Sequence, residues 1–161
     1  MKPSVEELVE TYQNRLFAVA FNVCKNAHDA EDVVQDTFIQ YLSQKREFES
    51  EEHIRAWLLR VAINKAKNKV TSFFHRNVFP LEEYMQTLQF PSEESGDLFE
   101  AVMKLPEKYR IVIHLFYYED YSTKEIADIL KLTTDNVKIR LSRGRKLLRT
   151  TLKEVWEDDE S

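Results

Sequence analysis

The chain has 161 residues, 43% of them hydrophobic and 32% charged, with a formal net charge of −5, an ordinary composition for one globular domain or two small ones. Two glycines and four prolines nearly exclude hairpins that need a positive φ, so we expect an all-α fold. No apolar run approaches the roughly 20 residues that span a bilayer, and a lone cysteine, Cys24, excludes an internal disulfide and agrees with a cytoplasmic location.

Three helices are predicted in the first half of the chain. The first covers about 4–23, the second 30–44 and the third 53–72, and a polar loop with one aromatic, Phe48, separates the last two. Ser4 and Glu7 form a capping box for the first helix, and Asn26 or Asp29 can cap the second. The predicted buried positions of the second and third helices are Val34, Phe38, Tyr41, Leu42, Ile54, Trp57, Leu58, Val61 and Ala62.

Helical periodicity fades after the third helix and returns near residue 97. We therefore assign 1–76 to one domain, 77–95 to a linker, 96–156 to a second domain and 157–161 to an acidic tail. The second domain is expected to contain a helix over 97–104, one that begins at Pro106 and carries an apolar stripe over 109–118, one from a capping box at Ser122 to Leu130, and one from Thr133 or Thr134 to Trp156.

Positive charge is gathered into two tracts. Residues 53–81 contain six Lys or Arg and no acid, and residues 122–153 contain nine against three acids. This leaves 8 bases and 25 acids elsewhere, so the modest net charge hides a segregated surface. Such a distribution predicts two places that hold a polyanion.

The second basic tract has the pattern of a helix-turn-helix DNA reader, in which a short helix and a tight turn precede a long basic helix. Ile126, Ala127, Leu130, Leu132, Val137, Leu141, Gly144 and Leu148 are predicted to face inward. The outward side of the long helix then carries Lys138, Ile139, Ser142, Arg143, Lys146 and Arg149. A helix with this face can enter a major groove, with early residues at base edges and later arginines at phosphates. The alternative is a solvated charged helix.

The first basic tract mixes amides and aromatics with basic residues. Asn side chains can bond base edges, and aromatic rings can stack on unpaired bases. The mixture consists of Asn64, Lys65, Lys67, Asn68, Lys69, Phe73 and Phe74. An ordinary surface helix explains this composition about as well.

Two stretches resemble one family. The string from Asp29 to Phe38, then Phe48, then Ala56 to Asn64 resembles region 2 of the extracytoplasmic-function (ECF) sigma factors, which direct bacterial RNA polymerase to promoters. The strings 105–110, 121–127 and 137–145 are similar to region 4 of the same family. The two together, in this order, cover nearly the whole chain apart from the linker and tail.

The resemblance implies a role for each matching residue. Asp32, Gln35, Asp36 and Ile39 would dock on the core polymerase. Phe48 would lie in a loop that captures a flipped base of the −10 element, and Arg60, Asn64, Lys65, Lys67 and Asn68 would contact the same element. Lys138, Ile139, Ser142, Arg143 and Lys146 would contact the −35 element. Trp57 could act as a melting wedge, but a core position is favoured.

The chain departs from the family at the helix-turn-helix turn. Lys131 stands where a glycine is usual, so this turn either needs no positive φ or tolerates some strain. Ile139 places an apolar side chain where a polar one is common, and a thymine methyl is a plausible contact for it. The −35 sequence therefore cannot be copied from relatives.

The expected partners are core RNA polymerase, promoter DNA and, as the resemblance implies, an anti-sigma factor. No catalytic residue, metal site or cofactor is expected, because the four histidines are widely spaced and two distant glycines cannot form a phosphate-binding loop. Two other functions remain open: a dimeric helix-turn-helix regulator that acts without polymerase and, with little support, an enzyme.

Overall fold

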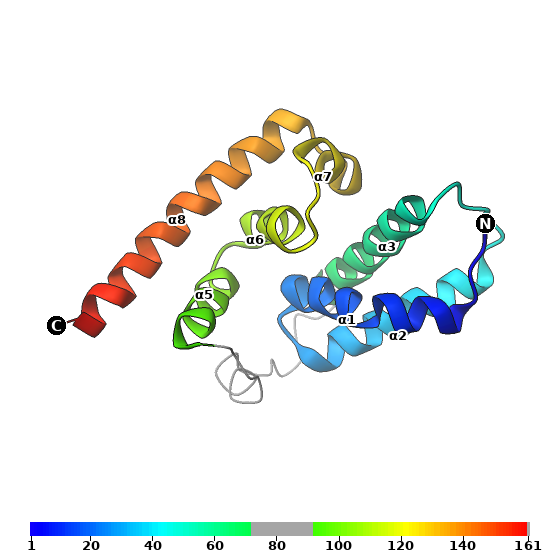
Figure 1. The fold of residues 1–161 in the computed structure, drawn as a ribbon, viewed down its shortest axis with the longest axis horizontal. Helices are drawn as coiled ribbons and strands as arrows, with labels where there is room; N and C mark the ends of the chain where they lie inside the picture. Colours follow the sequence, from blue (N-terminus) through cyan, green and yellow to red (C-terminus); the bar gives the residue numbers. More distant parts are fainter. Residues whose placement is uncertain (72–91, 161) are drawn as a thin grey trace. The chain divides into compact units, whose positions relative to one another are not determined.

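The computed structural model describes residues 1–71 and 92–160, and every regular element in those ranges is a helix (Figure 1). The chain divides into two compact units, one containing the helices before residue 72 and the other those after residue 91. The all-α prediction is confirmed. Most of the predicted linker, and Arg76 of the first basic tract, lie outside the described residues.

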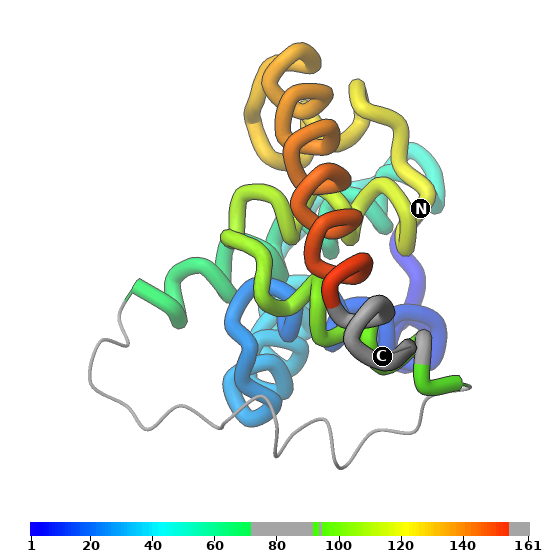
Figure 2. Tube along the Cα trace, turned by 90° about the vertical axis from the view of Figure 1, so that its left-hand side faces the viewer, coloured from blue at the N-terminus to red at the C-terminus, as the bar shows by residue number. Residues whose placement is uncertain are grey.

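The first unit consists of α1 (Val5–Cys24), α2 (Ala27–Ser43) and α3 (Glu51–Thr71). Each of the three packs on the other two, and Figure 2 shows them side by side at the blue and cyan end of the tube. Their shared core is closed to solvent because each helix turns an apolar stripe inward. Its least exposed large side chains include Leu16, Val33, Tyr41, Ile54 and Leu58.

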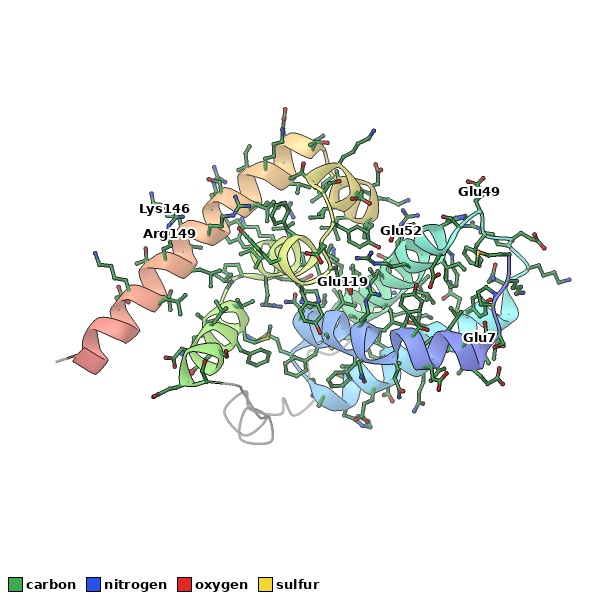
Figure 3. All side chains as sticks on the ribbon, in the orientation of Figure 1. Glu7, Glu49, Glu52, Glu119, Lys146 and Arg149 are labelled. Atoms are coloured by element: carbon green, nitrogen blue, oxygen red, sulfur yellow. The ribbon has the colours of Figure 1, made fainter. Side chains whose placement is uncertain are left out.

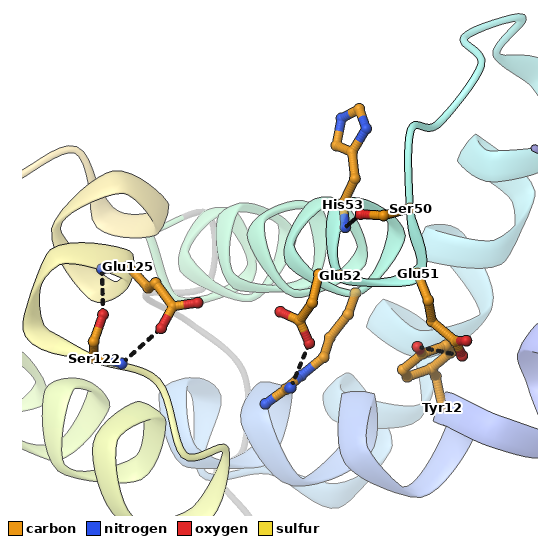
Figure 4. Close-up of polar contacts among 8 residues, drawn as sticks. Tyr12, Ser50, Glu51, Glu52, His53, Ser122 and Glu125 are labelled. Carbon is orange, nitrogen blue, oxygen red and sulfur yellow. Dashed lines mark hydrogen bonds and ion pairs between the residues drawn. The ribbon is translucent and has the colours of Figure 1, made fainter.

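Capping residues set where these helices begin. The Ser4 hydroxyl accepts from the Glu7 backbone N–H at 3.2 Å. Helix α2 begins three residues earlier than predicted because Asn26 caps it, its side-chain oxygen accepting from the Asp29 N–H at 2.9 Å. Helix α3 begins at Glu51 instead of residue 53, since the Ser50 hydroxyl accepts from the His53 N–H at 3.1 Å (Figure 4).

Burial in the first unit follows the predicted pattern with one exception. Trp57 is only 9% exposed, which agrees with a core role instead of a melting wedge. The prediction that Leu42 is buried is wrong, because 60% of it is exposed. Leu42 lies near the end of α2, one residue beyond the buried Tyr41, and the helix rotates it out of the core.

The second unit contains α5 (Glu93–Met103), α6 (Glu107–Ile113), the π-helical turn η1 (His114–Tyr118), α7 (Thr123–Leu130) and α8 (Thr134–Glu160). Helix α5 begins inside the predicted linker because the Ser92 hydroxyl accepts from the Ser95 N–H at 3.1 Å. Helix α8 continues to Glu160, so residues 157–160 extend the helix beyond its predicted end at Trp156.

The π-helical turn was not predicted. The apolar stripe over 109–118 was expected on one continuous α-helix, but the backbone widens at His114. Leu115 is fully buried, while Tyr117 and Tyr118 are more than half exposed. A π-turn shifts the face that a helix presents, which explains why the last two aromatics leave the core.

The helix-turn-helix arrangement is formed by α7, the turn and α8. Ser122 and Glu125 make both bonds of the predicted capping box, at 3.1 and 3.0 Å (Figure 4). Ile129 is buried where Leu130 was predicted, and Leu130 is only partly covered. Lys131 closes α7 in the left-handed conformation, with φ of 57°, so the turn does need a positive φ.

Candidate polymerase and nucleic-acid interfaces

Helix α2 presents a mixed acidic and apolar face to solvent. Gln35, Asp36 and Ile39 are exposed, and Ile39 is 60% exposed. Leu42, three residues beyond Ile39, extends this face and was missed because its position fits an inward stripe as well as an outward one. An apolar pair between carboxylate and amide groups is a composition suited to a protein partner.

A groove of about 310 Å³ lies beside this face, between α1 and α2. It is lined by Gln13, Asn14, Phe17, Glu31, Val34 and Gln35. Because Gln35 belongs both to the groove and to the exposed face, the two form one continuous surface. The sequence pattern predicted the α2 residues but not the contribution of α1.

Asp32 differs from its neighbours because it already has partners. Its carboxylate lies 3.5 Å from the Lys69 ammonium and 3.8 Å from the His28 imidazole. Lys69 belongs to the first basic tract on α3, so this ion pair joins α2 to the end of α3. An exposed ion pair of this kind is weak, at roughly 0 to 1 kcal/mol, and a partner protein can displace it.

The loop between α2 and α3 holds Phe48 in the core. The ring is 2% exposed and lies 5.6 Å from the Trp57 ring, 6.0 Å from Tyr41 and 5.0 Å from His53. The ring is therefore closed to a DNA base in this structure, and its contact with the −10 element stays a prediction. Exposing it would break aromatic packing, so Phe48 anchors the loop from inside.

The α3 residues predicted to contact DNA share one stretch of surface. Asn64 and Asn68 are exposed and lie four residues apart, which places them on one side of the helix. Arg60, Lys65 and Lys67 are half-buried. The opposite side, with Ile63 and Ala66, faces the core.

The second predicted DNA face lies on α8. Lys138, Ile139, Ser142, Arg143 and Lys146 are all exposed, while Val137, Leu141 and Gly144 are buried on the opposite side. Figure 3 shows Lys146 and Arg149 projecting from α8 on the side away from α6. Ile139 is 49% exposed, so its apolar side chain is available to a ligand.

Gly144 allows α8 to approach α6 closely. A Cβ at this position would lie 2.6 Å from Cδ1 of Ile113 and 3.3 Å from Cβ of Tyr109. The glycine is needed for this close packing and not for its φ, which is negative. The packing holds the exposed face of α8 at a defined angle to the rest of its unit.

Arg145 is a functional candidate that sequence reasoning placed only in the basic tract. Its guanidinium lies over the rings of Phe116 and Tyr117, at 5.3 and 5.4 Å from their centroids, and its Nε donates to the Tyr117 hydroxyl. These contacts tie α8 to the π-helical turn. The sequence feature that could have indicated a role for Arg145 is the aromatic run 116–118. Which of these rings face outward depends on the π-turn, which was not predicted.

Among the described residues of the second unit, His114 has the most strongly shifted pKa. Burial lowers its pKa to about 4, and the nearby Glu119 opposes this only in part. The ring stacks on Tyr118 with centroids 4.8 Å apart. His114 is therefore neutral at physiological pH.

Within 1–71 and 92–160, no three His, Cys, Asp or Glu side chains come close enough to hold a metal ion. No helix in those ranges has the length and apolar content needed to cross a membrane.

Both units match models of one protein family. Residues 8–72 match the model described as Sigma-70 region 2, and residues 95–148 match that described as Sigma-70, region 4. Among named relatives, the chain is 28% identical to the ECF RNA polymerase sigma factor SigW of Bacillus subtilis, over 92% of this chain and 89% of that protein. It is 27% identical to the ECF RNA polymerase sigma-E factor of Haemophilus influenzae, over 91% and 86%.

Solved structures show the same architecture. The structure of CnrH in complex with the cytosolic domain of CnrY is 26% identical in sequence, with a TM-score of 0.65, covering 93% of this chain and 88% of that one. The sigma factor RpoE from Bartonella quintana, solved with the anti-sigma factor NepR, has a TM-score of 0.74 at 23% identity and covers 92% and 96%, a likeness of fold.

Paired regions 2 and 4 define a promoter-specificity subunit of bacterial RNA polymerase. The chain belongs to the sigma-70 family, as a member of its ECF subfamily. It binds core RNA polymerase and DNA and directs transcription initiation at promoters. Sigma factors are not enzymes, so the alternatives of an enzyme and of a regulator independent of polymerase are set aside.

Proposed function

We propose that the second unit reads the −35 element through the exposed face of α8, and that the first unit reads and opens the −10 element through α3 and the loop before it. The observation that carries this proposal is the two-sided character of α8. Its buried side is apolar, and its exposed side carries Lys138, Ser142, Arg143 and Lys146. A helix held by one side and cationic on the other suits a major groove.

The −10 role is supported by α3, where Asn64 and Asn68 share an exposed side with lysines close by. Amides can read base edges, and lysines neutralise phosphates. Since Phe48 is buried, we assign base capture to the backbone and polar groups of the 44–50 loop and not to its ring. Opening one or two bases costs a few kcal/mol, which binding contacts can offset.

Substitutions in the two units should affect different promoter elements. In run-off transcription with core polymerase, on promoters chosen from a randomised library, Arg143→Ala should cost about 1 to 3 kcal/mol of −35 discrimination. Asn64→Ala should weaken discrimination at −10 by a similar amount. Lys104→Gln, which removes an exposed charge from the second unit at the end of α5, is the control and should change neither. Effects on the opposite elements would show the assignment to be wrong.

We further propose that the exposed face of α2, with its groove, is the surface that docks on the polymerase. Ile39 and Leu42 are large apolar side chains exposed beside Asp36 and Gln35. A buried apolar anchor surrounded by polar groups is the usual centre of a protein interface.

Ile39→Ser should lower affinity for purified core polymerase by about 1 to 3 kcal/mol, measured by titration with a labelled sigma factor. Ile139→Ser is the matched control, because it removes an isoleucine that is also about half exposed, from the proposed DNA face of α8. Equal losses in the two variants would contradict the assignment of the docking surface to α2.

An anti-sigma partner and a cytoplasmic location also belong to this proposal. The similar CnrH was solved bound to the cytosolic domain of CnrY, which supports an inhibitory protein partner for this chain as well. A subunit that acts with polymerase on chromosomal DNA works in the cytoplasm.

A further inference from the structure

The first three residues run alongside the loop that joins α2 to α3. The backbone nitrogen of Met1 donates to the Phe48 carbonyl at 2.9 Å, and the Phe48 N–H donates to the Met1 carbonyl at 3.2 Å. This reciprocal pair is the pattern of a short antiparallel bridge between segments 47 residues apart. Figure 1 shows the N-terminus beside the loop that enters α3.

Side chains tie the start of the loop to the same three residues. The Lys2 ammonium donates to the Gln44 carbonyl at 2.8 Å and lies 5.8 Å from the centroid of the Tyr41 ring. The Tyr41 hydroxyl donates to the Pro3 carbonyl. Burial raises the pKa of Tyr41, so this hydroxyl remains a donor throughout the physiological range.

The other side of the loop is fixed by the core. Phe48 packs against Tyr41 and Trp57, and the Glu49 N–H donates to Nδ1 of His53 at 3.1 Å. The loop is therefore held at its start by Lys2, near its end by Met1, and from within by Phe48. Seven residues without regular structure would otherwise sample many conformations.

We propose that residues 1–3 are a positioning element for −10 base capture, holding the 44–50 loop in its base-accepting shape before DNA arrives. The proposal rests on the assignment of this loop to base capture. A loop ordered in advance loses less conformational entropy when it binds, so the contacts of residues 1–3 strengthen capture without touching DNA. Pro3 helps, because its fixed φ limits the freedom of the segment.

The test uses holoenzyme assembled with the double variant Lys2→Met and Tyr41→Phe, which keeps the Tyr41 ring and removes two of the donors. The matched control is Lys108→Met with Tyr12→Phe. It also removes one exposed lysine and one buried hydroxyl, the latter donating to Glu51 instead of the N-terminal segment (Figure 4). Lys2→Met alone serves as a second variant if the double variant folds poorly in thermal unfolding.

Open-complex formation is measured on a library-selected promoter and on copies with a single abasic site at each non-template position of the −10 element. We expect open-complex formation by the double variant to fall about three- to tenfold on the intact promoter, the lower end of what the loss of two hydrogen bonds would give. On the promoter copy that lacks the captured base, open-complex formation by the double variant should equal that of the wild-type protein. The control should match the wild type on both.

Two results would overturn the proposal while leaving the loop assignment intact. One is no loss on the intact promoter, and the other is an equal loss on intact and abasic promoters, which would mean that residues 1–3 only stabilise the fold. A wild-type protein that is indifferent to every abasic site would instead show that the loop captures no base, and would remove the proposed function of the loop together with this inference.

Discussion

Three non-glycine residues in the described part of the chain hold the left-handed backbone conformation that usually favours glycine. They are Lys25, Asp120 and Lys131, with φ of 54°, 58° and 57°. Lys25 and Lys131 close α1 and α7, where their N–H groups donate to Phe21 and Ala127. Because the chain has only two glycines, lysines take these helix-ending positions. Crowding of the Cβ atom in this conformation costs about 1 kcal/mol or more of stability per residue.

Lys131→Gly should therefore stabilise the second unit. We expect its free energy of unfolding to rise by about 0.5 to 1 kcal/mol, the relief of crowding being offset in part by greater freedom of glycine in the unfolded chain. Urea unfolding followed by circular dichroism measures this. Lys131→Ala keeps the crowded Cβ and should match the wild type within about 0.5 kcal/mol, and a glycine variant less stable than the alanine variant would refute the argument.

At the scale of elements, the π-helical turn η1 organises the surroundings of α8. It turns Tyr117 outward to meet Arg145 of α8, and it places His114 against Tyr118 with its Nε2 buried. A π-turn costs regular hydrogen bonding, and such turns often mark functional positions. Here the π-turn provides the two aromatic rings that Arg145 of α8 contacts. Gly144 allows the close approach of α8 to α6.

His114 makes the stability of the second unit depend on pH. Its pKa is about 4 in the folded chain and near 6.5 when unfolded, so between these values the unfolded state binds more protons. By linkage, His114 contributes its full stabilisation above about pH 6.5, and this contribution to the free energy of unfolding decreases as pH falls toward 4. His114→Phe keeps an aromatic ring against Tyr118 and removes the titration.

Urea unfolding of both proteins at several pH values from 7 to 4.5 measures this effect. The two proteins carry the same carboxylates, so the difference between their free energies of unfolding reports the contribution of His114. We expect the free energy of unfolding of the variant, relative to that of the wild type, to rise steadily as pH falls. A difference independent of pH would show that His114 is not responsible.

At the scale of the whole molecule, charge separation explains why two units are needed. Outside the two basic tracts the chain has 25 acids and only 8 bases, and these repel DNA. Each unit offers only a small cationic face. We propose that docking on polymerase holds both faces at a fixed spacing, which would make the second DNA contact intramolecular.

The isolated chain should consequently bind promoters weakly and without sequence preference, whereas the holoenzyme binds specifically. In the holoenzyme, Lys146→Gln should weaken binding on all promoters similarly and reduce the salt dependence of log K by about 0.9, the value for one phosphate contact. Footprinting and fluorescence anisotropy at several salt concentrations measure both effects, with a scrambled promoter as the control. A tight, specific footprint by the isolated chain would contradict this view.

The sequence alone determined that the chain is helical, roughly where its helices lie, and which side of α8 is exposed and cationic. These depend on local periodicity, capping residues and charge, so Val137, Leu141 and Lys138 could be assigned to their sides of a helix without knowing what it packs against. Helix starts were less certain, because a cap at Asn26 or Asp29 fits equally well until the chain folds.

Only tertiary structure decided the direction of Leu42 and Phe48, the π-turn and the contacts of residues 1–3. Leu42 lies near the end of α2, on the side of the helix turned away from the core, and Phe48 is buried because its ring packs against Tyr41 and Trp57, on the two helices that flank its loop. The bond between Met1 and Phe48 joins residues 47 apart. Such contacts exist only after three helices pack together, so no periodic pattern in the sequence carries them.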